Sequence, residues 1–225
     1  EPARKVGGDF YDGFLIDGGT GPALGIVVAD VCDKGVGAAM FMALIRTLIR
    51  AAADPRYAGS PTADGPEGAL DRAVRLTNRY LAETHGEENM FATLFFGVLD
   101  PASGRLLYVN GGHEPPVVIG PAGVRERLAP TGPAVGLLPD MAFGIGETAL
   151  APGDALLAFT DGATDARGPG GAIFTEERLL ELVAPPLPGS AARLLDRVGE
   201  AVRRHEAGTE RFDDLTLLSV LRRTA

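Results

Sequence analysis

The chain has 225 residues, of which 45% are hydrophobic and 23% charged, a composition typical of a globular domain with a sizeable core. Its formal net charge is −9, which argues against nucleic acid or an anionic membrane as the main partner, because both select basic surfaces. A single cysteine, Cys32, excludes an intrachain disulfide and fits a reducing compartment, so we expect a cytoplasmic protein.

Apolar runs in the chain are short. Arg46 and Arg50 interrupt the longest one before it reaches the roughly 18 residues that a membrane span needs, so we expect neither membrane insertion nor a signal peptide. The chain starts at Glu1 without Met and reaches a glycine pair at Gly7 and Gly8. We therefore expect one domain, residues 1–225, excised from a longer protein.

The first part of the chain predicts two strands and then two helices. Residues 10–17 and the apolar run 24–29 are typical of strands joined by a hairpin loop, which would bring Asp9 and Asp30 to a common neighbourhood. Residues 35–53 have helical periodicity with a wide apolar face, on which we expect Met40 and Met42 to fill the core. A loop at 54–66 leads to a second helix at 67–83, and we expect both helices to pack on one face of a sheet.

The remainder predicts mostly strands. They cover residues 90–99, 105–110, 117–119, 143–150, 154–160 and 216–221, with helices at 175–183 and 190–206 and a glycine-rich flap at 168–172. The strands come in hairpins rather than alternating with helices. This order favours an α+β fold with antiparallel sheets.

Four separate stretches place an acid at the boundary of a β-rich run, and in three of them a glycine or a second acid stands beside it. The acids are Asp9, Asp30, Asp161 and the pair Asp213-Asp214. One such acid is equally well explained by solvation, but four suggest convergence on one place. Clustered carboxylates repel unless cations lie between them, and oxygen ligands without a Cys or His cluster select Mg²⁺ or Mn²⁺ over Zn²⁺. We therefore expect two divalent cations that activate a bridging water and neutralise a phosphoryl oxygen.

Other catalytic chemistries lack their motifs. A C-x₅-R loop starting at Cys32 would need arginine where Ala38 stands, and the chain has no H-E-x-x-H, G-x-x-x-x-G-K or G-x-S-x-G pattern. His113 lies in a Gly/Pro-rich turn, and two interpretations stay open for it: a structural turn residue or a group near the site.

Five short motifs occur in an order that resembles the metal-dependent protein phosphatases, in particular the bacterial SpoIIE/RsbU-type serine phosphatases. They are GGDFYD (7–12), VADVCDKGVGAAMFMA (28–43), NGGHEPP (110–116), TDGATDAR (160–167) and FDDLT (212–216). The resemblance spans residues 6–220 and implies a four-layer αββα sandwich of two antiparallel sheets flanked by helix pairs. It also implies a protein serine/threonine phosphatase that hydrolyses phosphoserine or phosphothreonine with two Mn²⁺ or Mg²⁺ ions.

The resemblance implies roles for the acids. Asp30 would bridge both metals, Asp161 and Asp213 would complete one metal site, and Asp9 with the backbone carbonyl of Val31 would complete the other. Asp30, Asp161 and Asp213 would then act in catalysis through metal-bound water.

Further residues have supporting roles by the same resemblance. Asp214 would orient Asp213 from behind. Cys32 and Asp33 stand where relatives usually carry Ser-Gly, and Asp33 would either reach a metal through water or cap the following helix. Arg4 or Lys5 would hold the phosphate, although a solvated charge explains either equally well. The histidine of eukaryotic relatives is absent after Asp30, so the general acid is unassigned.

The partners follow from the resemblance as well. The substrate would be a phosphorylated anti-sigma-factor antagonist or a similar regulatory protein, and an upstream sensor domain would act through the helix at 35–53. The oligomeric state is open, with a homodimer as one possibility. Two alternatives also stay open for the activity: a catalytically silent binding module with the same fold, and a metallo-phosphoesterase acting on small phosphates.

Overall fold

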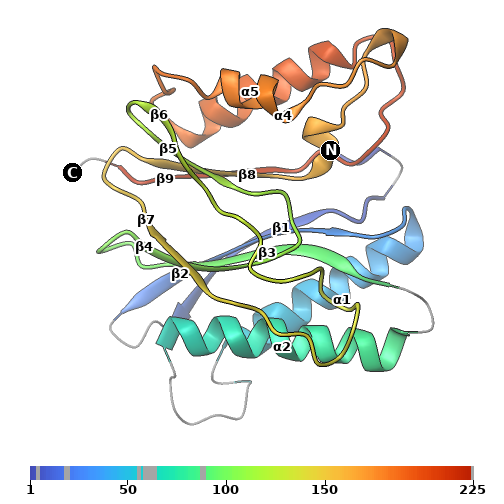
Figure 1. Ribbon diagram of the computed structural model, residues 1–225, viewed down its shortest axis with the longest axis vertical. Helices are drawn as coiled ribbons and strands as arrows, with labels where there is room; N and C mark the ends of the chain where they lie inside the picture. Colours follow the sequence, from blue (N-terminus) through green and yellow to red (C-terminus); the bar gives the residue numbers. More distant parts are fainter. Residues whose placement is uncertain (4–5, 18–20, 55–56, 58–64, 87–89, 224–225) are drawn as a thin grey trace.

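The computed structural model describes residues 1–3, 6–17, 21–54, 57, 65–86 and 90–223, and these residues form four layers (Figure 1). A helix pair covers a five-stranded sheet, which faces a four-stranded sheet that is covered by a second helix pair. Every strand pairing in both sheets is antiparallel. The predicted α+β class and the αββα sandwich are therefore confirmed.

The five-stranded sheet carries the first acids of the predicted site. Its strands, in spatial order, are β1 (Phe10–Asp17), β2 (Pro22–Val31), β3 (Ala92–Leu99), β4 (Arg105–Gly111) and β7 (Gly146–Ala149). Helices α1 (Val36–Ala53) and α2 (Gly65–His85) cover its outer face (Figure 1). The predicted hairpin of the first two strands is confirmed.

The four-stranded sheet carries the remaining acids. Its strands, in spatial order, are β6 (Gly123–Arg127), β5 (Val117–Gly120), β8 (Ala155–Phe159) and β9 (Leu217–Leu221). A short helix α3 (Asp161–Thr164) and a 3₁₀ turn (Pro169–Gly171) follow β8 and lead to α4 (Glu176–Leu182) and α5 (Ala191–His205). Strands β8 and β9 are neighbours, with Phe159 opposite Leu217, so the segments at the end of β8 and the start of β9 meet at one edge of the sandwich.

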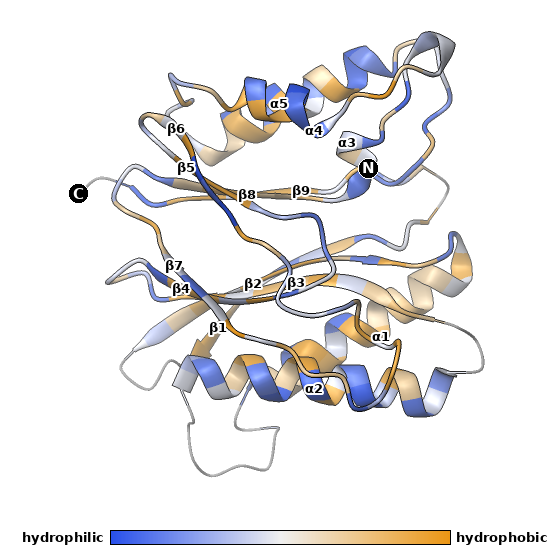
Figure 2. Ribbon diagram, in the orientation of Figure 1, coloured by the Kyte–Doolittle hydropathy of each residue, from blue (hydrophilic) through white to orange (hydrophobic). Residues whose placement is uncertain are grey.

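Three hydrophobic cores hold the four layers together. Ile45, Ile49 and Phe96 belong to the core between α1, α2 and the five-stranded sheet. Phe95 belongs to the core between the sheets, and Phe159 to the core beneath α4 and α5. Figure 2 shows much of the central strands in hydrophobic colours, whereas α2 and α5 carry both hydrophobic and hydrophilic residues along their lengths. Each buried aromatic or branched side chain contributes about 1.5–3 kcal/mol from the area that it removes from water.

Some local predictions are wrong. Met40 was expected in the core, but its side chain is 69% exposed. The buried face of α1 is centred on Ile45 and Ile49, and Met40 lies five residues before Ile45, about 140° around the helix. Strand β6 and helix α3 were not predicted, because β6 contains a single apolar side chain, Val124, and α3 is a single turn.

Helix α1 is also long and apolar enough to cross a membrane by length and composition alone, contrary to the prediction from run length. Only Arg46 and Arg50 are charged within it, and both pair with Asp12 of β1 at 3.2 and 2.5 Å. Ile45 and Ile49 of the same helix are 1% exposed. In this fold α1 is therefore one layer of the sandwich, held by an apolar face and by two arginines.

Candidate active site

Asp9 and Asp30 face each other across the first two strands. Asp9 lies one residue before β1, Asp30 is the last residue but one of β2, and the pairing of Phe10 with Ala29 sets them opposite. Burial raises the pKa of Asp9 to about 8, opposed by a hydrogen bond from Thr160 and reinforced by the charge of Asp30. Burial also raises the pKa of Asp30 to about 6, and the charge of Asp161 adds to this increase. The two carboxyl groups are thus poorly solvated and close to further negative charge.

Asp161 and Asp213 approach the same place from the other sheet. Asp161 is the first residue of α3, and Asp213 lies shortly before β9, the neighbour of β8. Burial raises the pKa of Asp161, and the charge of Asp213 raises it further. The charges of Asp161 and Asp213 also contribute to the raised pKa of Asp30, so acids from distant parts of the sequence share one electrostatic environment.

Thr160 joins the two sheets at this point. Its hydroxyl donates to Asp9 Oδ2 at 2.7 Å and accepts a hydrogen bond from the Thr216 amide at 3.1 Å. The Thr160 amide in turn donates to the Thr216 carbonyl at 3.1 Å, and the side chain is fully buried. The sequence reasoning missed Thr160, although it stands directly before Asp161 in the TDG motif.

Asp214 anchors the loop that carries Asp9. Its carboxylate accepts hydrogen bonds from the amides of Ala3 at 2.6 Å and Gly8 at 2.9 Å, and it is 7% exposed. A Cβ atom on Gly7 would come within 2.0 Å of Asp214 Oδ2, so the loop needs glycine there. Its role behind Asp213 stays a prediction, since the contacts of its carboxylate are with the N-terminal loop.

The backbone carbonyl of Val31 lies against the same loop. A Cβ atom on Gly8 would come within 2.9 Å of the Val31 oxygen, so glycine allows the loop to approach it closely. Asp9 and this carbonyl are therefore brought into one neighbourhood, as the predicted second metal position requires. The two candidates for holding phosphate, Arg4 and Lys5, lie outside the described residues.

Asp33 occupies a conformation that favours glycine. Its φ is 73°, and its Oδ1 atom accepts a hydrogen bond from the Lys34 amide at 2.7 Å. Helix α1 has Gly35 as its N-cap and no side-chain capping bond, so Asp33 does not cap it. The positive φ gives a physical reason for the glycine that the family resemblance implies at this position.

His113 is a buried neutral residue. Its side chain is 2% exposed, and Nδ1 lies 2.9 Å from the hydroxyl of Thr93 on β3. Its amide donates to Asn110 Oδ1 at 2.8 Å. Burial lowers the pKa of His113 to about 4, so the ring is neutral at physiological pH.

Lys34 brings a cation to the acids. Its Nζ atom donates to Asp213 Oδ2 and to the Phe212 carbonyl, both at 2.8 Å. Among the described residues, no three Asp, Glu, His or Cys side chains converge as a ready-made metal site. The donor set nevertheless fits divalent cations: the groups are hard oxygens, and the raised pKa values of Asp9 and Asp30 are those of carboxyl groups that lack compensating charge.

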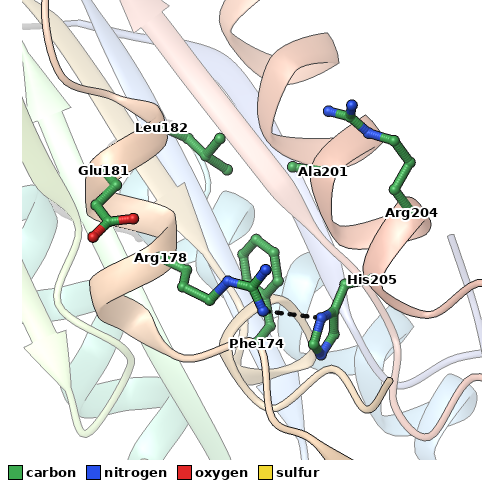
Figure 3. Close-up of a pocket in the computed structure, with 7 residues that line it drawn as sticks. All are labelled: Phe174, Arg178, Glu181, Leu182, Ala201, Arg204 and His205. Atoms are coloured by element: carbon green, nitrogen blue, oxygen red, sulfur yellow. Dashed lines mark hydrogen bonds between the residues drawn. The ribbon is translucent and has the colours of Figure 1, made fainter. Parts of the chain in front are cut away.

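A separate cavity of about 550 Å³ lies between α4 and α5 (Figure 3). It is lined by Phe174, Arg178, Glu181, Leu182, Ala201, Arg204 and His205, and the Arg178 guanidinium points to the His205 ring, 3.1 Å from Nδ1. None of the site aspartates lines it. The candidate active site is therefore the carboxylate cluster at the sandwich edge.

Two packed antiparallel sheets with helix pairs outside are the fold of solved PP2C phosphatase domains. The chain superposes on the SiaA-PP2C domain of Pseudomonas aeruginosa with a TM-score of 0.79 at 21% identity, over 98% of this chain and 83% of that one. The chain belongs to the SpoIIE family, since the family profile of Stage II sporulation protein E matches residues 20–223. The resemblance to SpoIIE/RsbU-type protein serine/threonine phosphatases is thereby confirmed.

Two curated relatives extend over almost the whole chain. Protein IcfG of Synechocystis sp. is 42% identical over 237 residues, which covers 99% of this chain and 37% of IcfG. Phosphoserine phosphatase RsbU of Bacillus subtilis is 26% identical over 224 residues, which covers 99% of this chain and 61% of RsbU. The chain therefore corresponds to a part of each of these longer proteins.

Proposed function

We propose that this chain hydrolyses phosphoserine or phosphothreonine on a phosphorylated regulatory protein, using two divalent cations, Mn²⁺ or Mg²⁺. The observation that carries the proposal is the meeting of Asp9, Asp30, Asp161 and Asp213 at one edge of the sandwich. When bound, the cations would supply a water nucleophile and neutralise charge on the phosphoryl group.

The protein's own residues would hold this arrangement in place. Asp30 would help to hold both ions, Asp161 and Asp213 would hold one of them, and Asp9 with the Val31 carbonyl would hold the other. Thr160 fixes Asp9 by its hydrogen bond of 2.7 Å, and Asp214 fixes the preceding loop by its bond to the Gly8 amide. Fixed ligands lower the cost of reorganisation when the charge on the phosphoryl group changes.

The biological setting is a further part of the proposal. RsbU is named a phosphoserine phosphatase, which supports a phosphorylated regulator, such as an anti-sigma-factor antagonist, as the substrate. The greater length of the relatives supports the interpretation that residues 1–225 form a single phosphatase domain of a longer protein. An upstream sensor domain would regulate its activity. Cys32, the only cysteine in the chain, supports a cytoplasmic location.

A phosphate-release assay tests the proposal. The substrates are a small phosphoester and a phosphoserine protein, each with and without Mn²⁺. The enzymes are the wild type, Asp30→Asn and the control Asp140→Asn, which changes an exposed aspartate outside the cluster. We expect Mn²⁺-dependent release in the wild type and the control, and a loss of about a hundredfold or more in Asp30→Asn.

The other outcomes separate the alternatives. Activity that survives both chelation and Asp30→Asn contradicts the two-metal mechanism. Metal binding without activity on any phosphoserine protein favours a silent binding module. Activity that is restricted to the small phosphoester favours a small-molecule phosphoesterase.

A further inference from the structure

The ammonium group of Lys34 lies between the carboxylate cluster and an exposed aromatic ring. Its Nζ atom is 2.8 Å from Asp213 Oδ2 and 4.7 Å from the centre of the Phe212 ring. The Lys34 and Asp213 side chains are 32% and 25% exposed, so solvent and ions can reach this pair. A protein cation thus already neutralises a carboxylate that the proposed function assigns to a metal.

Arg167 brings a second cation to the same ring. Its guanidinium carbon is 3.8 Å from the centre of the Phe212 ring, within the range of a cation–π contact. Arg167 follows α3, the helix that begins with Asp161, and within the described part of the chain no carboxylate forms an ion pair with it. The Phe212 ring, itself 49% exposed, therefore holds two positive groups beside the cluster in a chain of net charge −9.

A divalent cation and the Lys34 ammonium would compete for Asp213. Both would lie against the same carboxylate, and two cations at such a distance repel each other. A lysine at position 34 is suited to releasing Asp213 and binding another anion. Of the 21 lysines and arginines in the chain only Lys5 and Lys34 are lysines, and a lysine presents a compact charge on a flexible stem where an arginine would grip the carboxylate with two parallel bonds.

Once displaced from Asp213, the Lys34 ammonium group would be placed to bind a phosphoryl group at the site. The contact with Phe212 keeps the end of Lys34 at the edge of the cluster, near Arg167. A phosphate monoester carries up to two negative charges, and lysine and arginine are the side chains that bind it by charge-assisted hydrogen bonds. These two residues would supply the positive charge that an acidic protein needs for a phosphorylated substrate.

On the basis of the proposed function, we propose that Lys34 exchanges partners. It neutralises Asp213 in the metal-free site and, once a divalent cation holds Asp213, binds the phosphoryl group of the substrate together with Arg167.

Calorimetric titration with Mn²⁺ tests the first half. Replacing Lys34 by Met removes the competing cation, and we expect Lys34→Met to bind Mn²⁺ roughly fivefold more tightly than the wild type, as for the loss of a partly exposed ion pair. Lys34→Arg keeps the competitor and should not bind Mn²⁺ more tightly. Arg167→Met is the matched control for net charge beside the same ring, and its Mn²⁺ affinity should stay within about twofold of the wild type.

Lysine side-chain NMR follows the exchange directly. Because the chain has only two lysines, the Lys34 signal is the one that disappears in Lys34→Met. We expect Mg²⁺ to shift this signal, and inorganic phosphate to shift it again in the Mg²⁺-loaded protein. Phosphate affinity of the loaded protein should fall about tenfold in Lys34→Met and in Arg167→Met, the loss expected for one charge-assisted hydrogen bond.

The outcomes distinguish this inference from the proposed function. A wild type that binds neither Mn²⁺ nor Mg²⁺ contradicts the proposed metal site itself. Metal binding with an unmoved Lys34 signal and no gain in affinity in Lys34→Met overturns the partner exchange alone. An equal gain in Arg167→Met also overturns it, because a general effect of charge then suffices. Unchanged phosphate affinity in Lys34→Met overturns the phosphoryl contact.

Discussion

The hydroxyl of Thr160 donates a hydrogen bond of 2.7 Å to the carboxylate of Asp9, a residue 151 positions away in the chain. Asp9 directly precedes β1 of the five-stranded sheet, and Thr160 directly follows β8 of the four-stranded sheet. One buried hydroxyl therefore connects the two halves of the sandwich at the proposed metal site.

Replacing Thr160 by Val should weaken both the fold and the site. The variant keeps the shape but removes the donor to Asp9 and the acceptor of the Thr216 amide, so we expect a loss of about 1–3 kcal/mol in the free energy of unfolding. Mn²⁺ affinity should fall roughly tenfold, the usual effect of losing a residue that orients a ligand. Urea denaturation and Mn²⁺ titration measure the two effects.

Thr148→Val is the control for this change. The Thr148 hydroxyl donates to Glu126, away from the acid cluster, so the same chemical change should leave Mn²⁺ affinity unaltered. Equal metal affinity in wild type and Thr160→Val would contradict the role given to Thr160.

The metal-free protein should lose stability as the pH rises. The pKa of Asp9 is raised to about 8 in the folded state from an ordinary value of 3.8, and that of Asp30 to about 6. Between pH 4 and pH 8 the folded chain therefore keeps protons that the unfolded chain has released, and the free energy of unfolding decreases across this window. Urea denaturation in the presence of a chelator, from pH 5 to pH 8, measures this decrease in the free energy of unfolding.

Asp9→Asn isolates the contribution of Asp9. An amide does not titrate, so the variant should lose less stability than the wild type between pH 6 and pH 8. Saturating Mg²⁺ should reverse the trend in the wild type, because a bound cation favours the ionised carboxylates. The same slope in both proteins without metal would be inconsistent with a raised pKa of Asp9.

Gly162 should tolerate no side chain. A Cβ atom there would come within 1.9 Å of the backbone carbonyl oxygen of Asp214, and backbone cannot turn away as a side chain does. We expect Gly162→Ala to cost about 3 kcal/mol or more of unfolding free energy. Gly37→Ala is the contrasting variant: it lies within α1 with open space around the position and should gain roughly 0.5–1 kcal/mol. A mild effect at Gly162 in thermal or urea denaturation would refute the close packing of this loop.

Position 33 should prefer glycine to a branched residue. The φ of 73° at Asp33 strains any residue with a Cβ atom, and β-branched residues most. Asp33→Gly should stay within about 0.5 kcal/mol of the wild type, since relief of strain offsets the lost hydrogen bond to the Lys34 amide. Asp33→Val should lose roughly 1–2 kcal/mol. Equal stability of the two variants would argue against a left-handed conformation at this position.

Local patterns in the sequence were sufficient to predict most helices and strands. They were not sufficient to predict which of their side chains are buried. The apolar run of the second strand and the periodicity of α1 were enough to predict the strand–loop–helix unit around Asp30, and the boundaries of β1 were predicted to the residue. The exposure of Met40 was not predictable, because an apolar face that is wider than the contact area does not reveal which part of it is covered. Strand β6 has too few apolar residues to stand out from a loop.

For the site, the sequence supplied the acids but not what holds them. Motif order sufficed to single out Asp9, Asp30, Asp161 and Asp213. The contacts of Thr160 and Asp214 depend on how two sheets and the N-terminal loop meet, and the contact of Lys34 with Asp213 joins residues 179 positions apart. No local spacing encodes such relationships.

The acids of the site also set a condition on synthesis. Asp9 and Asp30 leave the ribosome well before Asp213 and Asp214, which come just before β9, and Asp214 is the residue that anchors the loop of Asp9. A nascent chain that stops before residue 213 would carry the first two carboxylates without the partners that complete the set. The domain therefore cannot begin its proposed chemistry on a phosphorylated regulator until translation has passed nearly its whole length.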